Sequence, residues 1–135
     1  MNVIGIGIDL VDIPAFEEKL ARAAFREQLF TPAEQAQAES RRHPVQTYAG
    51  KFAVKEAVMK ALGAGIRQSV WFTAIEVLDA ESGAPAVVLH RAARDRAAAL
   101  QITGWHISIS HIPQAAVAVA LALGPDQPEA TPSGA

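Results

Sequence analysis

"KFAVKEAVMKALGAG", residues 51–65, is the centre of the longest helical pattern in this chain. The pattern spans Val45–Leu62, and the glycines Gly63 and Gly65 end it. Most of its residues are apolar, and a helix that is apolar on nearly all sides is usually buried. Three lysines and a single carboxylate, Glu56, interrupt the apolar residues of 51–65. Each of these charged groups needs a partner or a ligand, because an unpaired buried charge is costly.

The residues before this helix predict one strand and two helices. Val3–Val11 alternates as a strand does, with Ile4, Ile6, Ile8 and Leu10 on one face and Gly5, Gly7, Asp9 and Val11 on the other. Asp12 and Pro14 mark the start of a helix that we expect to reach Arg26. Its apolar stripe would be Ile13, Phe16, Leu20 and Ala24, and its basic side Lys19, Arg22 and Arg26. "TPAE", residues 31–34, is a capping box that begins a second, short helix.

The residues after the long helix predict two strand pairs and one more helix. "TAIEVLD" (73–79) and "AVVLH" (86–90) form a hairpin around Gly83, and an alanine-rich helix follows from Arg91 to about Gln101. "WHISISH" (105–111) and "AAVAVALAL" (115–123) form the second pair. We expect a single α+β domain over residues 1–123, followed by a disordered tail over 124–135.

Composition narrows the class of protein. The chain has 135 residues, of which 50% are hydrophobic and 19% charged, so it should fold as one compact unit. It has no cysteine, no basic leader and no apolar run long enough to cross a membrane, and we expect a soluble, cytoplasmic protein. A net charge of −2 argues against general nucleic-acid binding. Residues 41–67, however, carry six basic side chains against one acid, a local charge of +5. This excess indicates a small anionic ligand or a docking patch, unless it is a solvated basic face.

Two carboxylates are candidates for chemistry. Glu56 and Lys60 share one strip of the helix, where they form either a surface salt bridge or part of a partly buried site. Asp9 lies in the middle of a strand, where aspartate is disfavoured. Its neighbours on the same face, Gly5 and Gly7, indicate space for a ligand, although a structural aspartate would also fit.

Carboxylates from two elements beside lysines fit a magnesium site with a phosphate ligand. Mg²⁺ is usually held by one or two carboxylates together with water and phosphate oxygens. Gly63 and Gly65 could let the backbone approach a phosphate, although a helix C-cap explains them equally well. Ser110 and His111 stand at a strand end, where the histidine either bonds a phosphate or is structural. The sequence has no spacing of Cys or His residues typical of a zinc site. It also lacks a phosphate-binding P-loop, a dinucleotide-binding glycine motif and the serine elbow of a hydrolase.

The motifs "GIGIDLVDI" (5–13), "FAVKEAVMKALGAGI" (52–66) and "ISISH" (107–111) together resemble the holo-acyl-carrier-protein synthases, the small class of 4′-phosphopantetheinyl transferases. The resemblance spans residues 3 to about 123 and implies the fold of that family, with a small antiparallel sheet packed against a long helix. It also implies transfer of the phosphopantetheine arm of coenzyme A to a serine of an apo acyl carrier protein, with Mg²⁺. The released product would be adenosine 3′,5′-bisphosphate.

The resemblance further implies roles for individual residues. Asp9 and Glu56 would bind the metal, Glu56 would take the serine proton, and Lys60 would bind the phosphates of coenzyme A. Lys51, Gly63, Gly65, Ser110 and His111 are further candidates for coenzyme A binding. The larger class of the family has a third acid at the position of Val11, so water would complete the metal shell here, and Asp12 would cap a helix.

The family is usually a trimer with active sites between subunits, and its acidic carrier protein docks on basic residues of the first helix. Lys19, Arg22 and Arg26 are the candidates for that contact. Two other functions are also compatible with the sequence. The protein could be a module that binds coenzyme A without catalysing a reaction, or a structural oligomer whose charges form ordinary salt bridges.

Overall fold

The computed structural model describes residues 1–126 of the chain. The elements follow in the order β1 (Asn2–Asp12), α1 (Ile13–Leu20), α2 (Ala23–Leu29), α3 (Pro32–Glu39), α4 (Pro44–Leu62), η1 (Ile66–Gln68), η2 (Phe72–Ala74), β2 (Ile75–Asp79), β3 (Pro85–Leu89), α5 (Arg91–Ala99), β4 (Gly104–Ile112) and β5 (Ala115–Gly124). The expected tail lies outside the described residues except for Gly124, which ends β5, and the next two residues. Among the described residues, no helix has the length and apolar character needed to cross a bilayer.

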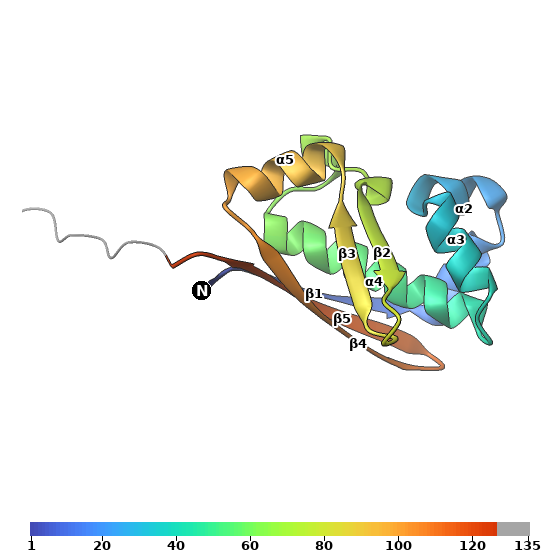
Figure 1. Cartoon of the computed structure of the whole chain (residues 1–135). Helices are drawn as coiled ribbons and strands as arrows, with labels where there is room; N and C mark the ends of the chain where they lie inside the picture. Colours follow the sequence, from blue (N-terminus) through green and yellow to red (C-terminus); the bar gives the residue numbers. More distant parts are fainter. Residues whose placement is uncertain (127–135) are drawn as a thin grey trace, which may run out of the picture.

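Helix α4 lies between two antiparallel sheets, which confirms the predicted α+β class (Figure 1). One sheet has the strand order β1-β5-β4, and the other is the hairpin β2-β3. The side of β5 that faces α4 is built of small buried residues, Ala116, Ala118, Ala120 and Ala122. Twelve of the nineteen residues of α4 are buried, so this helix is apolar on nearly every side because it is the core of the protein.

The sequence locates both ends of α4. Pro44 occupies the first turn, where a missing backbone N–H costs nothing. At the other end Gly63 takes the left-handed conformation, with φ of +63°. Its N–H donates to Lys60 O at 3.1 Å, and the N–H of Ala64 donates to Met59 O at 3.2 Å. Gly63 is therefore a helix C-cap, as one of the two readings of this glycine predicted.

The predicted single helix over residues 13–26 is wrong. The chain leaves the helical conformation at Arg22, whose φ and ψ are −88° and 123°, and α2 begins at Ala23. Arg26 turns back toward α1, and its Nη1 donates to Leu20 O at 2.6 Å. Lys19, Arg22 and Arg26 therefore do not share one side of one helix. Ala24, expected in the core, is exposed.

One face of the β1-β5-β4 sheet is uncovered in the single chain. Helix α4 packs against the other face, so the apolar residues of β1 that point away from it are open to solvent. Ile6, Ile8 and Leu10 are 65%, 57% and 70% exposed. A contiguous apolar face of this kind is typical of a surface that packs against another protein chain.

Candidate active site

Asp9, Glu56 and Lys60 meet where β1 crosses α4. Lys60 Nζ donates hydrogen bonds to Ile8 O at 2.8 Å and to Asp9 Oδ1 at 3.4 Å. Glu56 lies one turn before Lys60 on α4, and the Asp9 carboxylate is close enough to affect its pKa. Lys60 thus pairs with an acid on another element, whereas the surface alternative would pair it with Glu56. The structure brings these three predicted residues into one cluster.

Two glycines of β1 set the distance between the strand and the helix in this cluster. A Cβ atom on Gly7 would lie 1.7 Å from Ala57 O, and one on Gly5 would lie 2.3 Å from Ala61 O. Both distances are far shorter than any real contact, so only glycine permits this packing. Gly5 and Gly7 therefore leave no space for a ligand, contrary to our interpretation of them. They let the helix backbone contact the strand, which brings Asp9 beside Glu56.

Both carboxylates hold their protons more tightly than usual. Burial raises the pKa of Glu56 above 4.5, the negative charge of Asp9 raises it further, and Lys60 opposes the shift. Burial also raises the pKa of Asp9 above 3.8, while the hydrogen bond and charge of Lys60 lower it. Two partly desolvated acids that repel each other form a site that gains from a bound cation.

A pocket of about 410 Å³ opens beside Glu56 and Lys60. Its lining residues come from the end of α4, from the turn that follows it and from η2: Glu56, Met59, Lys60, Gly63, Ala64, Gly65, Ile66, Arg67, Gln68 and Phe72. We refer to it as the Glu56 pocket. The basic side chains of Lys60 and Arg67 make it suitable for an anion.

The two glycines of the Glu56 pocket do not present free backbone donors. The Gly63 N–H is bonded within the helix cap, and the Gly65 N–H donates to Gln68 Oε1 at 2.7 Å. No atom lies within 4 Å of a Cβ built on Gly65, so its missing side chain leaves the pocket open at this point. A phosphate could reach the Gly65 N–H only by displacing Gln68.

Asp9 and Glu56 suit a hard divalent cation. Within residues 1–126 no group of three or more His, Cys, Asp or Glu side chains could hold a metal, so any metal here would have two protein carboxylates at most. Mg²⁺ accepts such a site because it keeps several waters and binds substrate phosphate oxygens. Val11, at the position of the third acid, is buried in the core.

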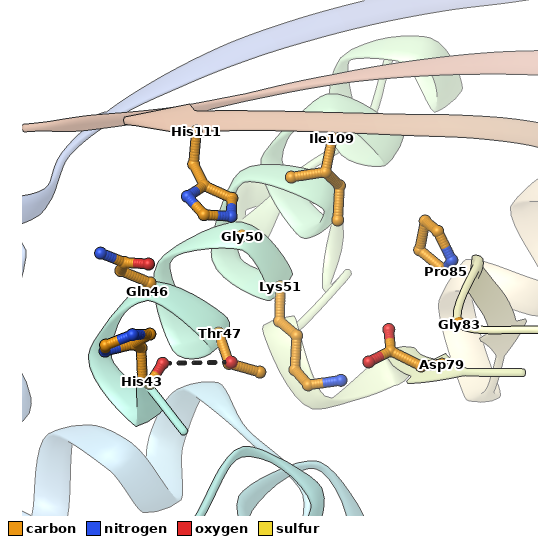
Figure 2. A pocket seen from close by; sticks show the side chains of 10 residues that line it. All are labelled: His43, Gln46, Thr47, Gly50, Lys51, Asp79, Gly83, Pro85, Ile109 and His111. Carbon is orange, nitrogen blue, oxygen red and sulfur yellow. Dashed lines mark hydrogen bonds between the residues drawn. The ribbon is translucent and has the colours of Figure 1, made fainter. Parts of the chain in front are cut away.

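Lys51 and His111 line a different pocket, of about 360 Å³, which we call the His111 pocket (Figure 2). It lies between the start of α4, strand β4 and the tip of the β2-β3 hairpin, and its lining residues are His43, Gln46, Thr47, Gly50, Lys51, Asp79, Gly83, Pro85, Ile109 and His111. Figure 2 shows the His111 ring pointing from β4 toward α4 near Gly50. Of the predicted coenzyme A ligands, Lys60, Gly63 and Gly65 thus line the Glu56 pocket and Lys51 and His111 the His111 pocket, whereas Ser110 lines neither.

Lys51 has structural partners in this chain. Its side chain is buried, and its Nζ donates to Val77 O at 2.8 Å and to Gln37 Oε1 at 2.6 Å. Burial lowers the pKa of Lys51, and the charge of Asp79 opposes this shift. Part of the basic excess of residues 41–67 is therefore internal, because Lys55 is also fully buried.

Ser110 points to the opposite side of the sheet from His111. Successive residues of a strand alternate, and Ser110 lies on the exposed face that also carries Ile8 and Leu10. Sequence reasoning did not identify Phe72 in the Glu56 pocket or His43 and Asp79 in the His111 pocket. The basic composition of residues 41–67 was a signal for Arg67, which also lines the Glu56 pocket, and His43 directly precedes α4, whereas Phe72 and Asp79 are brought in by tertiary packing.

Sequence comparison agrees with these features. The profile of the 4′-phosphopantetheinyl transferase superfamily matches residues 5–120. The holo-[acyl-carrier-protein] synthase of Solidesulfovibrio magneticus is 43% identical over 122 residues, covering 89% of this chain and 98% of that protein. That of Desulforudis audaxviator is 40% identical over 127 residues, covering 93% of this chain and 96% of that protein.

Solved structures of the same class have the same fold. The holo-[acyl-carrier-protein] synthase of Neisseria meningitidis matches with a TM-score of 0.82 at 29% identity, covering 90% of this chain and 99% of that one. The Bacillus anthracis enzyme, solved in complex with CoA (3′,5′-ADP), matches with a TM-score of 0.76 at 31% identity, covering 91% and 98% of the two chains. The chain therefore belongs to the 4′-phosphopantetheinyl transferase superfamily and, within it, to the holo-acyl-carrier-protein synthases.

Proposed function

We propose that this enzyme transfers the 4′-phosphopantetheine group of coenzyme A to a serine hydroxyl of an apo acyl carrier protein, with Mg²⁺, and releases adenosine 3′,5′-bisphosphate. The observation that carries the proposal is the convergence of Asp9, Glu56 and Lys60 beside a basic pocket. Relatives crystallised with coenzyme A support the choice of co-substrate.

In this reaction Glu56 acts as the general base. It accepts the proton of the serine hydroxyl, directly or through a water molecule, while the serine oxygen attacks the phosphorus that carries the pantetheine arm. The bond from that phosphorus to the bridging pyrophosphate oxygen breaks, and its electrons leave with adenosine 3′,5′-bisphosphate. In the metal-free chain, burial and the charge of Asp9 raise the pKa of Glu56, so its carboxylate binds a proton more readily than that of an exposed glutamate.

Lys60 stabilises the negative charge that grows on the leaving phosphate. Its side chain is 55% exposed and is held over β1 by Ile8 O, so its ammonium group can contact a ligand in the Glu56 pocket. A fixed positive charge of this kind lowers the energy of a transition state more than that of the ground state. Arg67, from the same pocket, would add to the charge that holds the phosphates.

Asp9 and Glu56 would hold the Mg²⁺ ion, with water and phosphate oxygens as the remaining ligands. The bound ion would supply charge neutralisation at the pyrophosphate. Asp9 would bind the ion through a mostly buried carboxylate, whose Oδ1 lies 3.4 Å from Lys60 Nζ.

The active enzyme would be a trimer that joins the Glu56 pocket of one subunit to the His111 pocket of the next. Two features support this assembly: the predicted ligands are divided between two pockets, and the apolar sheet face is uncovered. Packing three such faces around a threefold axis would bury Ile6, Ile8 and Leu10. His111, with Lys51 as a wall residue, would then contact coenzyme A whose phosphates are held by Lys60 and Arg67 in the Glu56 pocket of the neighbouring subunit. Ser110, on the packed face, would lie near the boundary between subunits.

The acidic carrier protein would dock beside α1 and α2. Lys19 and Arg22 are exposed at the junction of these helices, and Arg26 is partly buried because it bonds Leu20 O. We therefore assign the contact mainly to Lys19 and Arg22, with Arg26 as the residue that fixes the junction.

Intact mass spectrometry of an apo acyl carrier protein, incubated with this enzyme, coenzyme A and Mg²⁺, tests the proposal. The carrier should gain the mass of one phosphopantetheine group, and a carrier whose acceptor serine is replaced by alanine should gain none. A module that only binds coenzyme A would protect the enzyme against thermal unfolding yet leave the mass of the carrier unchanged. A structural oligomer would show neither effect.

A further inference from the structure

Lys55, the residue before Glu56, is fully buried and makes the most complete set of bonds of any lysine in the described residues. Its Nζ donates to Glu34 Oε1 at 2.8 Å, to Phe72 O at 2.9 Å and to Ile75 O at 2.5 Å. All three ammonium hydrogens therefore have acceptors. Adjacent helix positions point about 100° apart, so Lys55 faces the interior while Glu56 faces the pocket.

Glu34 is equally saturated. Its Oε1 also accepts the N–H of Thr31 at 2.8 Å, and its Oε2 accepts the N–H of Val77 at 2.8 Å. Neither side chain of the Lys55–Glu34 pair has any solvent exposure. The capping glutamate of α3 thus reaches across to the outer edge of β2, and it supplies a bond that a further strand would otherwise make.

The bonds of Lys55 fix both ends of η2, the short turn Phe72–Ala74. One acceptor is the carbonyl of Phe72 at its start, and the other is the carbonyl of Ile75 directly after it. The Phe72 side chain lines the Glu56 pocket. The centroid of its ring lies 5.5 Å from the ring centroid of Phe52 on α4. A single ammonium group therefore links the helix that carries Glu56 to another wall of the same pocket.

A buried ion pair is a poor source of stability, because removing two charges from water costs about as much as their attraction returns. Such a pair can instead fix geometry, since charged groups with saturated hydrogen bonds tolerate less displacement than apolar contacts do. We propose that Lys55 and Glu34 are positioning residues that hold η2 and Phe72 at the distance from Glu56 and Lys60 that coenzyme A requires. This inference rests on the proposed function and adds two residues to it that touch neither substrate.

The double variant Lys55→Met/Glu34→Leu tests this role, because it removes both charges and leaves neither unpaired. We expect a folded protein whose KM for coenzyme A rises about tenfold or more, while its KM for the carrier protein changes little. Glu34→Gln keeps the shape and one acceptor oxygen, but it leaves the Lys55 ammonium without a counter-charge and sets an amide N–H against a donor, so it should raise the same KM and also lower the melting temperature. Tyr48→Phe is the matched control, because it removes another bond between α4 and α3, Tyr48 Oη to Glu39 Oε1 at 2.9 Å, without touching η2. Its KM for coenzyme A should equal that of the wild type.

The two tryptophans provide a readout that does not depend on activity. Trp71 adjoins η2 and is 56% exposed, so in a Trp105→Phe background its emission reports on the position of this turn. The double variant should shift the Trp71 emission maximum and its quenching by acrylamide, and Tyr48→Phe should shift neither. A folded double variant with wild-type emission and wild-type KM would overturn the positioning role. If the wild type itself transfers no phosphopantetheine, the proposed function fails, and the emission measurement alone then decides whether the pair holds η2.

Discussion

Gly7 of β1 lies against the carbonyl oxygen of Ala57 on α4 so closely that a methyl group on Gly7 would stand 1.7 Å from that oxygen. Asp9 follows Gly7 by two residues on the same face of the strand, and Glu56 precedes Ala57 on the helix. The contact between two backbones thus sets the separation of the two carboxylates. The site depends on a residue that has no side chain.

Gly7→Ala should therefore impair transfer and stability together. The added methyl group must push β1 away from α4, which costs about 1–3 kcal/mol by the usual penalty for overpacking and separates Asp9 from Glu56. Gly104→Ala is the matched control, because no atom lies within 4 Å of a Cβ at that position. Denaturant unfolding and transfer rates measure both effects. Equal behaviour of the two variants would show that the close packing does not position the site.

The raised pKa of Glu56 predicts that its ionised carboxylate lowers the free energy of unfolding at neutral pH. Because the folded state holds the Glu56 proton more tightly than the unfolded state does, the stabilising contribution is complete below pH 4.5 and is lost as pH rises through the higher folded pKa. Glu56→Gln should therefore melt at a higher temperature than the wild type at pH 7 without Mg²⁺. The advantage should disappear below pH 4.5. A variant that is less stable than the wild type at pH 7 would mean that Glu56 is not destabilised there.

Complementation between two impaired variants tests the proposed trimer, in which two subunits share an active site. Glu56→Gln damages the Glu56 pocket, and His111→Ala damages the His111 pocket, so each homotrimer should be slow at low coenzyme A concentration. In mixed trimers, a His111→Ala subunit supplies an intact Glu56 pocket and a Glu56→Gln subunit supplies an intact His111 pocket. Unfolding and refolding the two together should recover part of the wild-type rate. A mixture no faster than its separate components would place the whole site within one chain.

Charge reversal at the junction of α1 and α2 tests carrier docking. Lys19→Glu/Arg22→Glu should raise KM for the carrier protein and leave KM for coenzyme A nearly unchanged, because in the proposed docking only the carrier contacts these side chains. The effect should shrink as salt rises, since exposed charges are screened within about 8–10 Å at ordinary ionic strength. The control is Arg94→Glu, which reverses the charge of an exposed side chain on α5, near the opposite end of the molecule (Figure 1). A similar rise in both KM values, or in neither, would exclude this junction as the docking surface.

The ends of most elements could be predicted because local residues determine them. Pro44 and Gly63 bound α4, and the Thr31–Glu34 capping box begins α3, with the N–H of Glu34 donating to Thr31 Oγ1 at 3.2 Å. Asp12 accepts the Ala15 N–H at 3.0 Å, as expected of a helix cap. Each of these features depends on residues within one turn of the helix end, so the sequence contains all the information needed.

The break at Arg22 could not be predicted in the same way. Helical periodicity continues through residues 13–26, whereas in the structure Phe16 of α1 packs across the break against Phe25 and Phe30. Phe16 contacts both of the other rings, at centroid distances of 5.9 Å and 6.5 Å. The spacing of apolar residues predicts that a segment is helical. It does not predict where the helix axis changes direction when contacts with distant residues stabilise that change.

The lysines of α4 show the same limit for the site. Lys51, Lys55 and Lys60 are alike in sequence, yet only Lys60 is exposed beside the carboxylates. Lys51 and Lys55 bond backbone carbonyls of β2 and the turn before it, whose positions relative to α4 follow from the fold. Glu56 and Asp9 were more predictable, because an acid in an apolar strip or mid-strand is unusual whatever surrounds it.

The transfer rate of Glu56→Gln and Asp9→Asn, measured by intact mass of the carrier protein under saturating Mg²⁺ and coenzyme A, tests the central claim that these two carboxylates form the catalytic site. Both substitutions preserve side-chain shape, so the fold should persist, as circular dichroism would verify. On this claim we expect a loss of about a hundredfold or more for each variant, the usual cost of removing electrostatic stabilisation or a general base. Near-wild-type turnover of either variant would contradict it.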